Sequence, residues 1–533
     1  MSDFSFSDDQ ELVALNAQVH ADPEEFEAWD KLVRAAEAQE GGLHRNSSPG
    51  AIASTRDVYD KLLSRFPLFF GYWKKYADLE FVIGGTEAAE MVYERGVASI
   101  GTSVDLWANY CGFKVDTNHD TDVIRELFER AADSVGLDFL SHPFWDKYLD
   151  FEERFESQER IVAILYRLIH IPVHQYARYF ERFRTMAANR PVTELAPPDV
   201  LLRFQEEIQQ SGATGKDLEQ ELRARIDGWH LELFNRTQTE TTTRWPYEQE
   251  IKRPYYHVTD LDDQQLVNWK NYLDFEEGEG DYARIKFLYE RCLVTTASYE
   301  EFWLRYARWM NSYPGKAEEV RNIYQRACGT YVPIAQPLIR WFYAAFEEAE
   351  GRPGVAAEIH SAILEKMPTD IQTIVSLANV ERRQHGVDAA IKVLSNYTGD
   401  LLATNSVDSG ALISEWARLV EKNMGDVQSA RSVYESNESS NFKSYAFWRG
   451  WLQFECEQAT SGGDEASQYQ LVQSVFGKVR HQSGIPRDSF KQLAAIYFEF
   501  LKSRGGREAM KEFMQLDREI YGPPSVANGA KEV

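Results

Sequence analysis

The sequence has few cysteines, a deficit of basic residues and no long apolar run. Four cysteines in 533 residues, with no CxxC pair, exclude a disulfide scaffold and predict reduced, mostly buried thiols of the kind found in intracellular proteins. No run approaches the roughly 18–20 apolar residues of a membrane span. The 84 Asp and Glu outnumber 58 Lys and Arg, giving a net charge of -26. That balance disfavours general, sequence-independent binding to the phosphate backbone of a nucleic acid.

Aromatic side chains, in contrast, are abundant. The chain holds 13 Trp, 27 Tyr and 30 Phe, and 43% of its residues are hydrophobic, which is too much apolar surface for a disordered chain. Single hydrophobic cores stop growing near ~250–300 residues. We therefore expect either several lobes or an elongated array of repeats.

A tryptophan motif, W-x2-Y-x3-E, recurs along the chain. The steps from Trp73 to Trp107 to Trp145 are 34 and 38 residues, and the steps from Trp269 to Trp303 to Trp341 are again 34 and 38. Regular periods of this size are typical of repeat architectures. The anchors of the motif are Trp73, Tyr76, Glu80, Trp107, Tyr110, Trp145, Tyr148, Glu152, Trp269, Tyr272, Glu276, Trp303, Tyr306, Trp448, Trp451 and Glu455.

A second motif, an aromatic residue followed by an acid and an arginine, lies about 20 residues after most first-motif copies. Its anchors are Tyr93, Arg95, Phe128, Arg130, Tyr289, Arg291, Tyr324 and Arg326. Spacings of 3, 4 and 7 place each set on one helix face, and glycine or proline breakers separate the two motifs. Each unit is thus an antiparallel helix pair that buries its rings only by stacking on neighbours. This predicts an all-α fold, an α-solenoid of antiparallel helix pairs in two arms joined by a helical spacer.

The recurring Glu and Arg have two interpretations. One is a structural, bidentate pair between helices of the same or adjacent repeats, and the other is a binding surface. Recurrence in several repeats favours the structural interpretation, because a binding site would normally occur once.

Breaks in the period define the expected organisation. We expect a partly disordered N-terminal segment (1–24), an N-terminal repeat arm (25–185), a spacer (186–265), a C-terminal repeat arm (266–521) and a disordered tail (522–533). The spacer should contain a long amphipathic helix around residues 218–233, where apolar residues step by 3 or 4. A threonine-rich stretch (237–243) and an irregular segment between Pro246 and Pro254 should follow it.

The search for catalytic or ligand-binding motifs finds little. His170 and His174 have helical metal-ligand spacing, but Pro172 separates them and no HExxH pattern is present. Residues 96–103 match part of a P-loop, but Thr102 stands where lysine is needed. We therefore predict no enzyme activity, no catalytic residue, no metal, no cofactor and no small-molecule substrate.

One segment runs against the acidic balance. Residues 167–190 carry five arginines, including Arg178, Arg182 and Arg184, interleaved with Tyr176, Tyr179 and Phe180. Basic residues mixed with rings are typical of RNA contacts. The alternative, which we favour, is a helix with core aromatics and solvated arginines, or an acceptor for an acidic protein.

The C-terminal arm is also rich in rings. Some of these aromatic side chains belong to the repeat core. The additional ones at 490–513 are candidates for an exposed apolar patch that a partner protein would cover. Solenoid ends need capping, and a dimer would supply it.

The two motifs together resemble the half-a-TPR (HAT) repeat across about residues 25–520. More narrowly, the two arms, the spacer and the stretch Glu250-Ile-Lys-Arg-Pro-Tyr-Tyr-His257, leading to Trp269, resemble the pre-mRNA-processing factor 39 family. Lys114 and Met310 depart from the pattern where Glu is expected, and His360 departs where an aromatic is expected.

This resemblance implies a non-catalytic nuclear scaffold of the U1 small nuclear ribonucleoprotein (snRNP) that acts in 5′ splice-site recognition. It also implies contacts with U1 snRNP proteins and a homodimer, or a heterodimer with a paralogue, through the C-terminal repeats, with RNA contact indirect or weak. Two alternatives stay open: a HAT scaffold of another RNA-processing complex (3′-end cleavage or ribosome biogenesis), and a direct RNA-binding module that uses the 167–190 strip.

Overall fold

The computed structural model describes residues 10–210, 216–403, 409–458 and 465–523. Of the segments expected to be partly or wholly disordered, residues 1–9 of 1–24 and residues 524–533 of 522–533 lie outside these ranges. The chain divides into two compact units, with the boundary between Phe302 and Trp303. Every regular element of the described residues is helical, which confirms the predicted all-α class.

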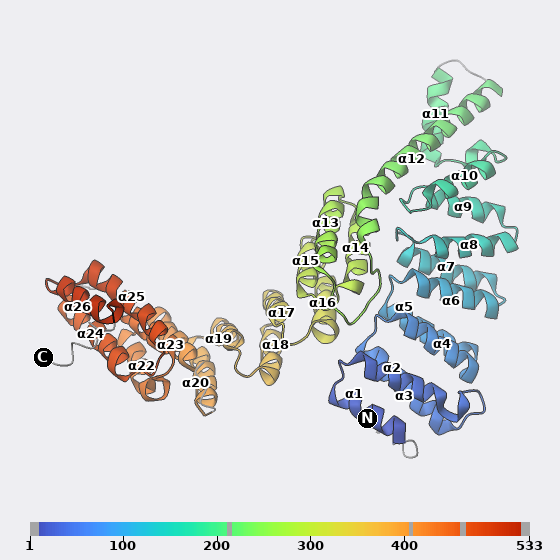
Figure 1. Ribbon diagram of the computed structural model, residues 1–533. Coiled ribbons are helices and arrows are strands. Elements are labelled where there is room, and N and C mark those ends of the chain that lie inside the picture. Colours follow the sequence, from blue (N-terminus) through green and yellow to red (C-terminus); the bar gives the residue numbers. More distant parts are fainter. Residues whose placement is uncertain (1–9, 211–215, 404–408, 459–464, 524–533) are drawn as a thin grey trace. The chain divides into compact units, whose positions relative to one another are not determined.

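The first unit is a stack of helix pairs followed by a long returning helix (Figure 1). Its elements are α1 (Gln10–Ala21), α2 (Phe26–Ala38), η1 (Gln39–Gly41), α3 (Pro49–Arg65), α4 (Phe70–Gly84), α5 (Thr86–Ser99), α6 (Val104–Thr117), α7 (Thr121–Val135), α8 (His142–Arg154), α9 (Gln158–Leu168), α10 (Tyr176–Ala187), η2 (Val192–Glu194), α11 (Pro198–Gln210), α12 (Lys216–Glu250), α13 (Asp263–Glu279) and α14 (Tyr282–Thr295).

The second unit continues the helix pairs. The boundary falls inside α15 (Glu300–Asn311). The remaining elements are α16 (Ala317–Arg326), η3 (Ala327–Tyr331), α17 (Leu338–Ala349), α18 (Pro353–Lys366), α19 (Ile371–His385), α20 (Val387–Ala403), α21 (Ser409–Leu419), η4 (Val420–Met424), α22 (Val427–Asn441), α23 (Tyr445–Glu457), α24 (Glu465–Gln482), α25 (Arg487–Arg504) and α26 (Ala509–Tyr521).

Local sequence sets many helix boundaries. Asp120 caps α7 by accepting from the Val123 amide, and Asp281 caps α14 through the Arg284 amide. Such side chains satisfy amides that the first helical turn leaves unpaired. Gly280 ends α13 with φ 82°, a left-handed conformation that glycine adopts without steric cost. Tight stops of this kind allow consecutive helices to reverse direction and pair.

Stacked rings join each helix pair to the next. Tyr59 of α3 stacks on Tyr76 of α4 with centroids 4.6 Å apart, and Tyr93 of α5 stacks on Tyr110 of α6 at 5.0 Å. In the second unit, Tyr434 of α22 stacks on a tryptophan of α23 at 5.6 Å. The rings that the two motifs supply therefore form the core between repeats, as the periodicity predicted.

The spacer differs from the expectation. The predicted amphipathic helix is present, but α12 does not end at the threonine-rich stretch; it continues through Pro246 to Glu250. Thr241 and Thr242 donate their hydroxyls to the carbonyl oxygens four residues earlier, and Thr237 donates to Ile169 at 2.9 Å. Tertiary contacts thus override the low helix propensity of this stretch.

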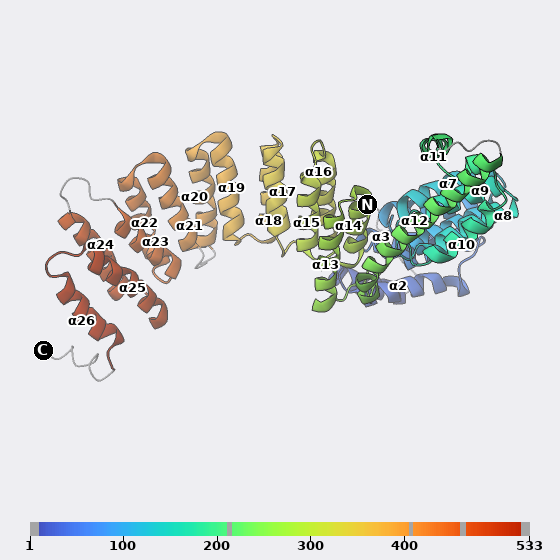
Figure 2. The same cartoon turned by 90° about the horizontal axis from the view of Figure 1, so that it is seen from above.

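The long helix α12 returns along the N-terminal repeats of its own unit. Its 35 residues span about 52 Å, and both views place it beside α10 (Figures 1 and 2). Phe234 packs on Phe180 of α10 with centroids 4.6 Å apart. The spacer is therefore packed against the arm that precedes it.

The aromatic surplus at 490–513 is mostly core, which corrects the expected exposed patch. Tyr497, Phe498 and Phe500 are at most 6% exposed. Tyr497 stacks on Phe476 of α24 with centroids 4.2 Å apart. The exposed apolar residues of the last helix are instead Met510, Met514 and Tyr521.

Candidate functional site: repeat contacts and interaction surfaces

The tryptophan anchors are buried, and several of them form a hydrogen bond to the turn that precedes their helix. The indole Nε1 of Trp73 donates to the carbonyl oxygen of Pro67 at 2.8 Å, and Trp107 donates to Gly101 at 2.9 Å. Trp448 repeats the bond, again to the residue six positions earlier. Each bond satisfies the one polar atom of an enclosed ring.

The other predicted anchors lie in the same interior. Less than a tenth of the residue surface is exposed for Tyr76, Glu80, Tyr93, Tyr110, Phe128, Trp145, Tyr148, Glu152, Trp269, Tyr272, Glu276, Tyr289, Arg291, Trp303, Tyr306, Tyr324, Trp451 and Glu455. Arg95 and Arg130 are about half exposed along their side chains. Arg326 lies over the Trp303 ring at 5.3 Å.

The first-helix glutamates form forked pairs with an arginine from the preceding repeat. Glu152 of α8 accepts from Arg125 Nε at 2.8 Å and from Nη2 at 3.1 Å. Arg125 lies three residues before the aromatic Phe128, whereas the sequence motif places its arginine two residues after it. The same fork joins Arg56 to Glu80, Arg244 to Glu276, Arg321 to Glu347, and Arg431 to Glu455.

One copy of this pair has its charges exchanged. Lys114 of α6 stands where most other repeats have Glu, and Glu90 of α5 stands where the repeats with the forked pair have Arg. Lys114 Nζ donates to Glu90 Oε1 at 2.7 Å. The departure at Lys114 is therefore compensated by a second departure, and the ion pair between the repeats is kept.

The motif arginines join a second set of contacts between repeats. Arg130 donates to both oxygens of Glu94, at 3.0 and 2.8 Å, and Tyr110 donates to the same carboxylate at 2.7 Å. The hydrogen bonds from Arg130 hold the pKa of Glu94 below its ordinary value. Equivalent pairs join Arg95 to Asp60, and Arg167 to Glu129.

These arginines also cover the tryptophan rings. Arg95 lies over Trp73 at 5.4 Å, Arg130 over Trp107 at 5.8 Å, and Arg167 over Trp145 at 5.5 Å. A cation over an indole face is attracted by the ring quadrupole. Each motif arginine thus links its own repeat to the preceding one, which supports the structural interpretation of the recurring charges.

The end of α12 supplies a repeat helix that sequence reasoning missed. Tyr247 stacks on Tyr272 at 5.1 Å with an interplanar angle of 4°. Arg244 and Glu276 form the forked pair, both 2% exposed along the side chain, and Glu248 accepts from Arg291 and Tyr272. The signal was available, because Arg244-x2-Tyr247-Glu248 matches Arg125-x2-Phe128-Glu129.

A buried charge cluster ties this repeat to the N-terminal repeats of the same unit. Arg291 of α14 binds Glu248 through Nη1 at 2.6 Å and Asp138 through Nε at 3.1 Å. Burial raises the pKa of Asp138, whereas Arg291 opposes that rise. Burial alone would lower the pKa of Arg291, but Asp138 and Glu248 raise it. Arg291 thus opposes the loss of charge on Asp138 that burial favours.

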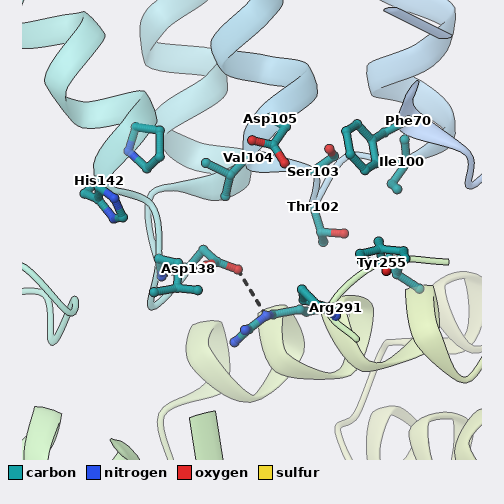
Figure 3. A pocket seen from close by; sticks show the side chains of 14 residues that line it. Phe70, Ile100, Thr102, Ser103, Val104, Asp105, Asp138, His142, Tyr255 and Arg291 are labelled. Carbon is teal, nitrogen blue, oxygen red and sulfur yellow. Dashed lines mark hydrogen bonds and ion pairs between the residues drawn. The ribbon is translucent and has the colours of Figure 1, made fainter. Parts of the chain in front are cut away.

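Beside this ion pair lies a cavity of about 310 Å³ (Figure 3). The turn before α6, the turn before α8, the segment around Tyr255, and α14 together enclose it. His142 lines the cavity, and burial lowers its pKa. The cavity marks where the returning chain covers the turn edge of the N-terminal repeats.

The arginine strip is already occupied by acids. Arg178 donates to Asp146 at 2.7 and 2.8 Å, Arg182 pairs with Glu153, and Arg184 pairs with Glu181 at 3.1 Å. Tyr179 and Phe180 are buried. This geometry matches the interpretation in which the rings are core and the arginines are surface residues.

The two other residues that depart from the repeat pattern, Met310 and His360, are buried in the core. Met310, in a glutamate position, is 1% exposed, and His360, in an aromatic position, is 3% exposed. Burial lowers the pKa of His360 to about 4. Its Nδ1 atom is buried without a hydrogen-bond partner.

Within residues 10–210, 216–403, 409–458 and 465–523, no group of three His, Cys, Asp or Glu side chains is arranged to hold a metal ion. In the same ranges, no helix combines the length and apolar character needed to cross a membrane.

Comparison with protein families gives two matches. A model described as the PRP39 N-terminal HAT repeat matches residues 13–185, and a model described as the PRP39 C-terminal HAT repeat matches residues 242–383. The second match begins inside α12, close to the repeat contacts of Arg244 and Tyr247.

Individual relatives extend the match to most of the chain. Pre-mRNA-processing factor 39 of Schizosaccharomyces pombe is 43% identical over 98% of this chain and 88% of its own length. The human protein of that name is 32% identical over 71% of this chain and 59% of its own length. A Saccharomyces cerevisiae protein named U1 small nuclear ribonucleoprotein component PRP42 is 23% identical over 57% of both chains.

Among solved structures, the crystal structure of CSTF-77 superposes with a TM-score of 0.51. It is 12% identical and covers 85% of this chain and 90% of its own. At that identity the likeness shows the fold alone.

Proposed function

The chain belongs to the pre-mRNA-processing factor 39 family, and from that premise we propose that it is a non-catalytic scaffold of the U1 snRNP in pre-mRNA splicing. The observation that carries the proposal is the 43% identity to the S. pombe protein over 98% of this chain. The link to U1 comes from the related S. cerevisiae protein, whose name describes it as a U1 component.

The architecture suits a scaffold. The motif residues make contacts between repeats: the rings stack, several indoles donate to backbone carbonyl oxygens, and the forked Arg–Glu pairs lie between helices. The surface left for partners is large and acidic, because the chain carries a net charge of -26. Acidic surfaces select basic protein segments and raise their rate of encounter.

In this proposal the protein acts in the nucleus, contacts other U1 snRNP proteins and contributes to 5′ splice-site recognition. RNA contact is indirect, and the ion pairs that occupy Arg178 and Arg182 support that assignment. A HAT scaffold of another RNA-processing complex is disfavoured, because models described as PRP39 repeats match residues 13–185 and 242–383.

The proposal includes a dimer, formed with a second copy or a paralogue through the C-terminal repeats. Met510, Met514 and Tyr521 of α26 are 48%, 63% and 49% exposed. Three large apolar side chains on one terminal helix favour a partner that covers them. If the partner is a second copy, sedimentation at micromolar concentration should give about twice the 61.4 kDa chain mass. It should give the monomer mass after Met510→Glu with Met514→Glu.

Gene replacement in S. pombe tests the splicing role. The chain should replace the 43% identical relative and keep introns spliced, as measured by sequencing of total RNA. A variant with Trp269→Ala, which removes a fully buried anchor, should fail and serves as the control. Intron retention with the folded, expressed wild-type chain would contradict the proposal.

A further inference from the structure

A groove on the N-terminal repeats is lined by exposed apolar and acidic side chains that are not part of the repeat motifs. It lies between α5 and α7, over α6, and has a volume of about 660 Å³. Its lining includes Met91, which is 68% exposed, and Val123, which is 40% exposed. The floor is formed by Tyr110, Lys114 and Leu127. Exposed apolar side chains of this size are typical of surfaces that a partner covers.

The exchanged Lys114–Glu90 ion pair changes the sign of the charge that the lining of this groove presents. At the corresponding position, three residues before the ring, α3 carries Arg56 and α7 carries Arg125, so the neighbouring repeats present a cation. Here α5 carries Glu90, which is 25% exposed along its side chain, while Lys114 is 10% exposed. A pair of either polarity would join the two helices. This polarity places the carboxylate in the groove and its cation deeper.

Further carboxylates follow the same rim. Glu87 of α5 and Glu126 of α7 line the groove, and neither forms an ion pair among the described residues. The cations of the lining are already paired: Lys114 with Glu90, Arg130 with Glu94, and Arg95 with Asp60. The uncompensated charge of the groove is therefore negative, and it surrounds the exposed Met91.

We propose that the α5–α7 groove is a docking site for a basic amphipathic segment of a partner protein. Apolar side chains of that segment contact Met91 and Val123, and its Lys or Arg side chains face Glu87, Glu90 and Glu126. The site rests on the proposed scaffold role and specifies the chemistry of one partner. A nucleic-acid occupant is disfavoured because phosphates would meet these carboxylates.

Fluorescence anisotropy tests the site on the full-length protein. The probe is a labelled synthetic helix with leucines on one face and lysines and arginines on the other; an acidic version of the same helix is the negative probe. The key variant combines Glu90→Arg with Lys114→Glu, which restores the polarity of the other repeats. It keeps the ion pair and leaves the net charge unchanged, so non-specific attraction to the acidic chain stays the same.

We expect this exchange to weaken binding of the basic helix about tenfold, because a groove carboxylate becomes a cation. Glu87→Gln with Glu126→Gln should weaken it about threefold. The matched control is Arg383→Glu with Glu348→Arg, which exchanges an ion pair of the second unit whose arginine is 45% and whose glutamate is 14% exposed along the side chain. This control should leave the affinity unchanged. Circular dichroism should show wild-type helix content in all three variants.

Equal affinities for the wild type and the folded Glu90/Lys114 exchange would overturn the site. So would an equal loss in the Arg383/Glu348 control, or tighter binding of single-stranded RNA than of the basic helix. Recovery of U1 RNA from nuclear extract separates this inference from the scaffold role. If the scaffold role is wrong, the unchanged chain recovers no U1 RNA, whereas failure of the groove alone leaves that recovery intact.

Discussion

Glu276→Gln offers the sharpest test of how the repeats are joined. Glu276 is 2% exposed along its side chain and accepts from Arg244 at 2.6 and 3.0 Å. A second guanidinium, that of Arg284, approaches it to 3.7 Å. Burial and the nearby Arg244 lower the pKa of Arg284. Neutralising Glu276 thus leaves two buried cations facing each other without their shared carboxylate.

The expected cost is about 3–5 kcal/mol, the usual penalty for removing one partner of a buried ion pair. The matched control is Asp60→Asn, which breaks the pair with Arg95, where both side chains are about half exposed. Because water and salt screen that pair, its loss should cost less than about 1 kcal/mol. Both substitutions remove one carboxylate charge, so the difference between them reports burial together with the second guanidinium at Glu276.

Hydrogen exchange followed by mass spectrometry is the suitable assay, because repeat arrays open locally and need not unfold in one step. Amides of the α12 end and of α13 should exchange roughly two to three and a half orders of magnitude faster in Glu276→Gln, since 1.4 kcal/mol is tenfold. Amides of α3 and α5 should change less than about fivefold in Asp60→Asn. Similar rates in the two variants would refute the claim that the α12 end is a packed repeat helix.

Three further outcomes are expected. Trp145→Ala removes a fully buried ring and should destabilise its unit by about 3–5 kcal/mol in urea unfolding; a loss below about 1 kcal/mol would contradict the anchor role. Lys114→Glu alone places two carboxylates together and should lower the melting temperature, which adding Glu90→Arg should restore; no rescue would contradict the exchanged pair. Burial lowers the pKa of His360 to about 4, so this side chain stays neutral in the folded protein, whereas the unfolded chain takes up a proton near pH 6.5. The contribution of His360 to the free energy of unfolding should therefore be lost as the pH falls from about 6.5 to 4. If the free energy of unfolding of His360→Leu depended on pH as steeply as that of the wild type, this explanation would be excluded.

The repeat architecture could be predicted because its signal is local. Trp, Tyr and Glu at spacings of 3 and 4 define one helix face, and the 34- and 38-residue steps in both halves define the stack. The end of α12 was missed for two local reasons. Trp269 follows Tyr247 by 22 residues, whereas Trp107 follows Tyr93 by 14, and Pro246 with the threonine run suggested an irregular segment.

The partners of charged residues could not be read from the motifs. Glu152 pairs with Arg125 because α7 and α8 are adjacent across a repeat boundary. Likewise, Arg178 and Arg182 face Asp146 and Glu153 of α8, which lie about 30 residues earlier in the chain. Such pairings depend on how helices stack in three dimensions, and several are equally compatible with the sequence alone.

The central claim, that this chain is a U1 scaffold, is tested most directly by native purification of the tagged protein from nuclear extract, followed by RNA sequencing and mass spectrometry of what is bound. We predict that U1 RNA and U1 snRNP proteins are the dominant components. Recovery of 3′-end cleavage or ribosome-biogenesis factors in their place would contradict it.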